Sequence, residues 1–147
     1  MKNKAKNLSD LFASIEGRRP RILIGGEKLS VLKKINALAN AFADLGCNVD
    51  IAPLHSDMPQ LAQQCAENDV DIVLIIAHEK IKESTLKKFQ EIVLGQNQEM
   101  ILSLYNNDTD SLSLDDTKLN HWILFNQKSN PAGLVQELLS SLMRHSE

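Results

Sequence analysis

Cysteine is scarce in this 147-residue chain, which has only Cys47 and Cys65. Both lie among apolar residues of predicted secondary structure, so we interpret them as small core residues in a reducing compartment. No Cys-x-x-Cys pair and no Cys/His cluster has the spacing of metal ligands. We therefore expect a cytoplasmic protein without a metal centre.

Long apolar runs and a strong net charge are also missing. No stretch approaches the ~20 apolar residues that a membrane-spanning helix requires, and no apolar run follows the N-terminal lysines as in a signal peptide. The formal net charge is −3, and 24% of the residues are charged and 43% hydrophobic. This composition is ordinary for a globular protein, and it gives no reason to expect nucleic acid or a membrane as a partner.

Basic residues are nevertheless concentrated near the N-terminus. They are Lys2, Lys4, Lys6, Arg18, Arg19 and Arg21. No aromatic residues are interleaved with them to stack on bases. We therefore interpret this cluster as a solvated surface rather than as a binding site for a polyanion.

Residues 1–16 are predicted to form a leader, and residues 17–147 a single domain. Within the leader we expect a short helix, Leu8–Ile15, with Ser9 as its N-cap. Its apolar face is expected to consist of Leu11, Phe12 and Ile15.

The rest of the chain alternates apolar strands with amphipathic helices. Continuous apolar runs predict strands covered on both faces, whereas alternation of apolar and polar residues predicts an edge strand. The expected strands are Arg21–Ile24, Cys47–Ile51, Val70–Ile76, Met100–Leu104 and Trp122–Phe125. Helices are expected at about Ser30–Leu45, at Met58–Glu67, after Ser84, and after Asn130 as N-cap. The segment Tyr105–Asn120 is expected to be a long polar loop.

Five strands that alternate with helices imply a parallel sheet with helices on both faces. The third strand is the most apolar and the second alternates. We therefore predict a single α/β domain with a flavodoxin-like (Rossmann-like), doubly wound sheet of order 2-1-3-4-5. Such folds bind ligands at the carboxyl ends of strands one and three, where the order reverses. Here Gly25–Leu29 and Ala77–Glu79 are expected to line that crevice.

Three stretches resemble one known family, in the same order. They are Gly17–Ile24, then Phe42–Gly46 with Val49–Ile51 behind it, and Glu67–Val73. Together they resemble the cobalamin-binding domain of methylmalonyl-CoA mutases, clearly as far as about Val73. The resemblance implies the flavodoxin-like fold and a mutase-like catalytic subunit as a partner.

The family that the chain resembles carries Asp-x-His-x-x-Gly in the loop after strand one. There the histidine coordinates cobalt, the aspartate orients the histidine, and the glycine admits the nucleotide tail of the cofactor. This sequence contains no such motif. Counted back from Phe42, the three motif positions fall on Leu29, Val31 and Lys34. Counted forward from Ile24, they fall on Ser30, Leu32 and Ile35.

Two further features of that family also lack counterparts here. A serine pair that the family places at the end of strand three falls near Ile76 and Ala77. A glycine pair after strand four falls within Leu104–Asn106, so we expect the space for the nucleotide tail to be filled. No functional residue of the family carries over to this chain.

The crevice still offers four candidates for contact with a ligand: Gly25, Gly26, His78 and Tyr105. The glycine pair precedes a helix N-terminus, a generic anion site, but Glu27 beside it would repel a phosphate. A tight turn is therefore the favoured interpretation of the pair. His78 is either an ordinary rim residue or a replacement cobalt ligand. His55 follows strand two, away from the point where the strand order reverses, and is a weaker candidate. His121 and His145 have no partner within reach in the sequence.

Two functions remain open. The first is a non-catalytic homologue that has lost the cobalt ligand, needs no cofactor, and acts as a binding or assembly module for a mutase-like subunit or for itself. The second is a corrinoid-binding subunit of a mutase-like isomerase or methyltransferase that binds cobalamin without the lower histidine. Leu29 and Val31 favour the first function if they point into the core, and the second if they line an open cleft. In neither case do we expect catalysis by this chain alone.

Overall fold

The computed structural model describes residues 2–26, 31–53, 57–78, 81–97, 99–106, 121–126 and 129–146, without the side chains of residues 2, 3, 145 and 146. The helices in these segments are α1 (Lys2–Glu16), α2 (Leu32–Ala43), α3 (Met58–Glu67), α4 (Glu83–Gln96) and α5 (Pro131–Ser146). The strands are β1 (Arg21–Gly26), β2 (Asn48–Ile51), β3 (Ile72–Ala77), β4 (Ile101–Asn106) and β5 (Trp122–Asn126). The predicted loop Tyr105–Asn120 is wrong at its start, because Tyr105 and Asn106 are the last two residues of β4. The rest of that segment, residues 107–120, lies outside the described residues.

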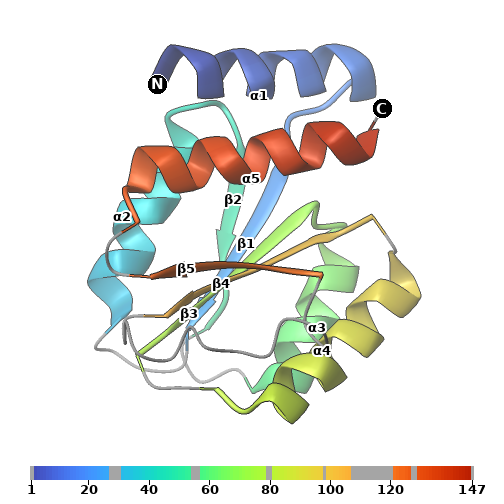
Figure 1. Cartoon of the computed structure of the whole chain (residues 1–147). Coiled ribbons are helices and arrows are strands. Elements are labelled where there is room, and N and C mark those ends of the chain that lie inside the picture. Colours follow the sequence, from blue (N-terminus) through green and yellow to red (C-terminus); the bar gives the residue numbers. More distant parts are fainter. Residues whose placement is uncertain are drawn as a thin grey trace.

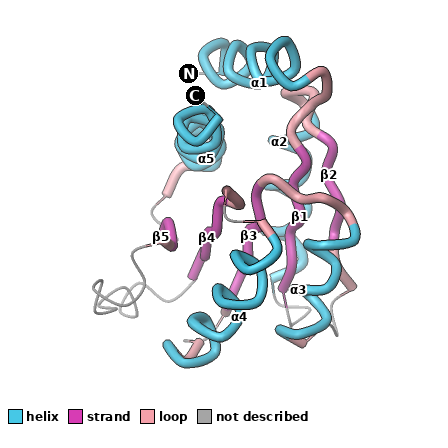
Figure 2. The backbone as a smooth tube through the Cα atoms, turned by 90° about the vertical axis from the view of Figure 1, so that its right-hand side faces the viewer, coloured by secondary structure: helices cyan, strands magenta, loops and turns pink. Residues whose placement is uncertain are grey.

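The strands form one parallel sheet of order β2-β1-β3-β4-β5 (Figure 1), which confirms the predicted flavodoxin-like fold. Residues of α1, α2 and α5 pack in one hydrophobic cluster with the sheet, and residues of α3 and α4 pack in another. The view along the sheet shows helices above and below it (Figure 2). Every residue of β3 is buried, because both of its faces are covered and it lies between two strands.

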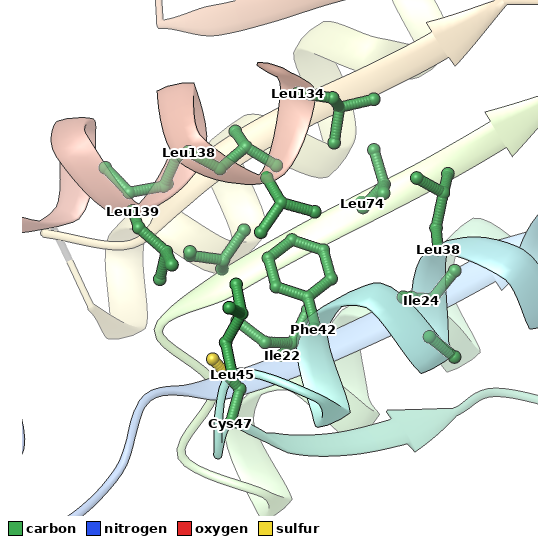
Figure 3. Packing of buried hydrophobic residues seen from close by; sticks show 14 of the residues in the cluster. Ile22, Ile24, Leu38, Phe42, Leu45, Cys47, Leu74, Leu134, Leu138 and Leu139 are labelled. Carbon is green, nitrogen blue, oxygen red and sulfur yellow. The ribbon is translucent and has the colours of Figure 1, made fainter. Parts of the chain in front are cut away.

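Phe42 of α2 lies at the centre of the first cluster. Its ring is surrounded by Ile22 of β1, Leu74 of β3 and Leu138 of α5 (Figure 3), and none of the four side chains is more than 1% exposed. Burying a side chain of this size contributes about 1.5–3 kcal/mol relative to leaving it exposed. Phe42 therefore ties α2, the sheet and α5 into one core.

Local signals set the ends of several helices. Asp57 and Gln60 form a capping box at α3, in which each side chain accepts a hydrogen bond of 2.9 Å from the other residue's backbone N–H. The Asn130 side chain accepts a hydrogen bond of 2.8 Å from the Ala132 N–H at the start of α5. Gly46 follows α2 with φ of +88°, a conformation that favours glycine.

Helix α1 differs from the predicted short helix. It begins at Lys2, and Ser9 is a fully buried residue in its middle rather than its N-cap. Ala5, Ser9 and Phe12 face the body of the protein, whereas Leu11 and Ile15 are exposed. The small Ser9 allows this close approach, and its hydroxyl lies 3.9 Å from the sulfur of Cys47. The helix packs against α5. The division of the chain into a leader, residues 1–16, and a domain, residues 17–147, stays a prediction.

The arginines near the N-terminus have acidic partners within the chain. Arg18 donates hydrogen bonds of 2.7 and 2.8 Å to the carboxylate of Asp71, and these bonds raise the pKa of the guanidinium. Arg19 donates to Asp10 of α1. These two arginines therefore have a structural role. Arg18 joins the segment between α1 and β1 to Asp71, which directly precedes β3, and Arg19 joins that segment to α1.

Cys47 and Cys65 are free and buried, in agreement with the prediction that they are core residues. Burial raises the pKa of the Cys47 thiol to about 11 and that of Cys65 to about 12, so both are protonated at neutral pH. No helix within the described segments is both long and apolar enough to cross a membrane.

We expect Asp71→Asn to lower the free energy of unfolding by about 2 kcal/mol, because it removes a charge that accepts bonds from Arg18 and from the Arg21 N–H at 2.8 Å. The measurement is urea unfolding followed by circular dichroism. Asp69→Asn is the matched control, since that carboxylate is 83% exposed and 3.8 Å from Arg21, and its loss should cost about 0.5 kcal/mol or less. Equal effects of the two substitutions would contradict the structural role of Asp71.

Candidate functional site

The carboxyl edge of the sheet brings three of the four candidate residues together. Gly26 of β1 lies opposite Ile76 of β3, and Ile76 lies opposite Tyr105 of β4. Gly25 precedes Gly26 in the same strand. His78 follows the end of β3 directly and is exposed. The register therefore places Gly26 and Tyr105 in one row, with Gly25 next to it and His78 beyond the end of the strand.

Gly25 and Gly26 belong to β1, so the predicted turn at this pair is wrong. Both residues are in close contact with the helices that cover the sheet. A Cβ atom at Gly26 would lie 2.8 Å from Val31 and 3.0 Å from both Ile35 and the carbonyl oxygen of Ile76. One at Gly25 would lie 2.9 Å from Leu61 of α3. The glycines thus serve close packing of α2 and α3 on β1.

Among the positions of the absent metal-binding motif, Val31 and Ile35 are buried in the core, with exposed fractions of 3% and 0%. Leu32 and Lys34 also lie within α2, and Leu29 and Ser30 are outside the described residues. None of the four described positions carries an imidazole. These residues do not fit the cobalt of a cobalamin bound through a lower histidine.

Tyr105 occupies the end of β4 beneath α2. It is 1% exposed, and its ring lies 5.1 Å from the ammonium group of Lys34, which is a cation–π contact. The hydroxyl is buried and has no hydrogen-bond partner among the residues that the structure describes. Asn106 beside it is also buried. Side chains of this size therefore occupy the end of β4 at the carboxyl edge.

No described group of three or more His, Cys, Asp and Glu residues is arranged to hold a metal ion. His121 is exposed at the start of β5, while His55 and the side chain of His145 lie outside the described residues. The contact between Lys34 and Tyr105 was not found by sequence reasoning. No local signal identifies it, because the two residues meet only when α2 packs on the sheet.

One hollow lies away from the carboxyl edge. It has a volume of about 370 Å³ and lies between α1, the end of α2 and the start of α5. Its lining is mainly aliphatic, from Ala5, Ala41, Leu45, Pro131, Ala132 and Val135. A smaller hollow of about 130 Å³ surrounds Arg18 and Asp71.

Comparison with known proteins agrees with the family resemblance seen in the sequence. About half of the chain is similar to methylmalonyl-CoA mutases. The methylmalonyl-CoA mutase large subunit of Streptomyces virginiae is 42% identical over 73 residues, which are 48% of this chain and 10% of that protein. The methylmalonyl-CoA mutase of Cereibacter sphaeroides is 33% identical over 92 residues, which are 58% of this chain and 13% of that protein. The resemblance to mutases is thus confirmed, while the chain spans only about a tenth of the length of these relatives.

No family model matches the chain. Among solved structures, a diflavin flavoprotein A3 from Nostoc sp. aligns with a TM-score of 0.53 at 13% sequence identity. The alignment covers 86% of this chain and 96% of that one. At this identity the likeness supports the fold alone.

We expect Gly26→Ala to destabilise the protein by about 1–3 kcal/mol, because the new methyl group meets the backbone oxygen of Ile76, which cannot move aside easily. Gly25→Ala should cost less, since only the flexible tips of Leu61 are in the way. Gly95→Ala in α4 is the control. Its Cβ meets nothing within 4 Å, and it should stabilise by about 0.5–1 kcal/mol. Urea unfolding of the three variants measures these values, and a harmless Gly26→Ala would argue against close packing of α2 on β1.

Tyr105→Phe tests whether the buried hydroxyl has any partner. Removing an unsatisfied buried hydroxyl should leave the stability unchanged or raise it by up to about 1 kcal/mol. Thermal and urea unfolding provide the measurement. A loss of about 1 kcal/mol or more would instead mean that the hydroxyl is hydrogen-bonded in solution.

Proposed function

We propose that this chain is a non-catalytic homologue of the mutase cobalamin-binding domain that no longer binds cobalamin and acts as a binding or assembly module. The observation that most supports this proposal is the close packing of Val31 and Ile35 on Gly26. This packing places the start of α2 at the carboxyl edge of the sheet, where a fold of this kind binds its ligand. Of the two residues that distinguish the open functions, Val31 is buried in the core and Leu29 is outside the described residues.

Two further features support this function. The end of β4 is filled by Tyr105, and the described residues at the edge provide no cobalt ligand except the exposed His78. Sequence identity of about 40% to large subunits of methylmalonyl-CoA mutases, over about half of this chain, supports descent from a domain of such an enzyme. A mutase-like catalytic subunit and a second copy of this chain are the partners that we infer for the module.

Titration with hydroxocobalamin and adenosylcobalamin tests the proposal. After gel filtration, the visible absorption spectrum of the protein fraction shows whether any cofactor has stayed bound. We expect the protein to elute without colour, because the described positions of the motif carry no imidazole, and Val31 and Ile35 pack in the core against Gly26. Free cobalamin run alone over the same column gives the background.

Colour in the protein fraction would contradict the proposal and favour the corrinoid-binding subunit. The spectrum would then show how the cofactor is held. An unshifted spectrum means that the cofactor's own base remains on the cobalt. A shift that His78→Ala abolishes would identify His78 as a replacement ligand.

A further inference from the structure

We infer that α1 is a hinged lid, which opens as a unit about Gly17 while the sheet and the other helices stay folded. The opened lid uncovers the thiol of Cys47. This conformational device goes beyond the proposed loss of cofactor binding and does not depend on it. Three features carry the inference: the sparse apolar anchoring of α1, a hinge without neighbours, and a fixed point directly after the hinge.

Helix α1 is held to the rest of the protein by few apolar contacts. It packs against α5, which lies between it and strands β4 and β5 (Figure 1, Figure 2). Phe12 is its one large apolar side chain that is fully buried, and its other buried residues, Ala5 and Ser9, are small. The remaining large apolar side chains of the helix are half-buried or exposed: Leu8, Leu11 and Ile15. Segments with so little buried apolar surface are the ones that open locally.

Helix α5, on which α1 lies, is held more firmly. Its buried apolar face consists of Leu134, Val135, Leu138, Leu139, Leu142 and Met143. These side chains belong to the same hydrophobic cluster as α2 and the sheet. Leu138 lies against Phe42 at the centre of that cluster (Figure 3). Opening of α1 therefore leaves this core in place.

Gly17 is suited to act as the hinge. It directly follows α1, and its φ of +74° favours glycine. A Cβ atom at Gly17 would meet nothing within 4 Å, so no neighbour restrains a rotation there. The next residue is fixed, because Arg18 donates two hydrogen bonds to the carboxylate of Asp71. Rotation about Gly17 therefore moves α1 and leaves β1 where it is.

The residues after the hinge also hold the lid closed. Arg19 donates a hydrogen bond to Asp10 of α1, and the guanidinium of Arg18 lies 5.3 Å from the centre of the Phe12 ring. The side chains of Arg19 and Asp10 are 37% and 47% exposed. Ion pairs with this exposure stabilise a structure only weakly. Contacts of this strength keep α1 closed most of the time without preventing its opening.

Cys47 lies beneath the lid and Cys65 does not. The sulfur of Cys47 is 3.9 Å from the hydroxyl of Ser9 in α1, whereas Cys65 belongs to α3 and to the hydrophobic cluster with α4. Both thiols are buried, and burial raises the pKa of each. Because a thiol reacts as its thiolate, neither reacts while its cover is in place. The two cysteines therefore report separately on the lid and on the rest of the fold.

Alkylation of the unmodified chain by iodoacetamide tests the lid, with mass spectrometry of the peptides to give the rate at each cysteine. Cys47 should react about tenfold faster than Cys65, or more, because opening of α1 requires less free energy than unfolding of the domain. Urea should accelerate the reaction of Cys47 less steeply, since opening of one helix exposes less surface. Equal rates, or an equal dependence on urea, would overturn the inference.

Phe12→Ala tests the anchor of the lid. It should accelerate the reaction of Cys47 by roughly tenfold or more and leave that of Cys65 unchanged, because it removes the one large side chain that α1 buries fully. Leu11→Ala is the matched control on the same helix. Leu11 is 47% exposed, so both rates should stay within about twofold of the original. An equal acceleration at both cysteines would mean that Phe12 supports the whole fold, and the lid would be excluded.

Amide hydrogen exchange of the unmodified chain gives a test that needs no variant. The backbone amides of α1 should exchange as one group, about tenfold faster than those of α5 and β3 or more. Protection of α1 equal to that of α5 would overturn the inference. These measurements report on α1 alone, whereas the cobalamin titration reports on cofactor binding, so either proposal can fail while the other stands.

Discussion

The close contact between α2 and β1 is the constraint on which the rest of this structure depends. Gly26 has no side chain, so Val31 and Ile35 reach the strand itself. That approach seats α2 with Phe42 in the centre of the core and covers Tyr105 at the end of β4. A parallel sheet of this order holds its ligands at this edge. One packing contact thus stabilises the domain at the edge where we propose that cofactor binding has been lost.

A second constraint joins the N-terminal helix to the sheet. Ser9 and Phe12 bury one face of α1, and the bonds from Arg18 to Asp71 fasten the segment after α1 beside the start of β3. Because the helix is anchored by this face, Leu11 and Ile15 are turned outward.

The fold was predictable from sequence because its signals are local and repeated. Continuous apolar residues mark β3, which is buried on both faces, and alternation marks the edge strand β2. The side chain of Asn130 begins α5 as expected. The predicted turn at Gly25 and the predicted cap at Ser9 are wrong for one shared reason. Small residues suit turns and caps, but they also allow close packing, and only the neighbours across the core decide between these uses.

The sequence by itself determined the order of strands and helices, the absence of the metal-binding motif and the similarity to mutases, since each depends on residue types and spacing along the chain. Tertiary structure decided which side chains pack against Gly26 at the carboxyl edge and which face of α1 is exposed. The contact of Lys34 with Tyr105 and that of Arg18 with Asp71 join residues far apart in the chain. Their pairing depends on how helices pack on the sheet, which no local pattern of residues encodes.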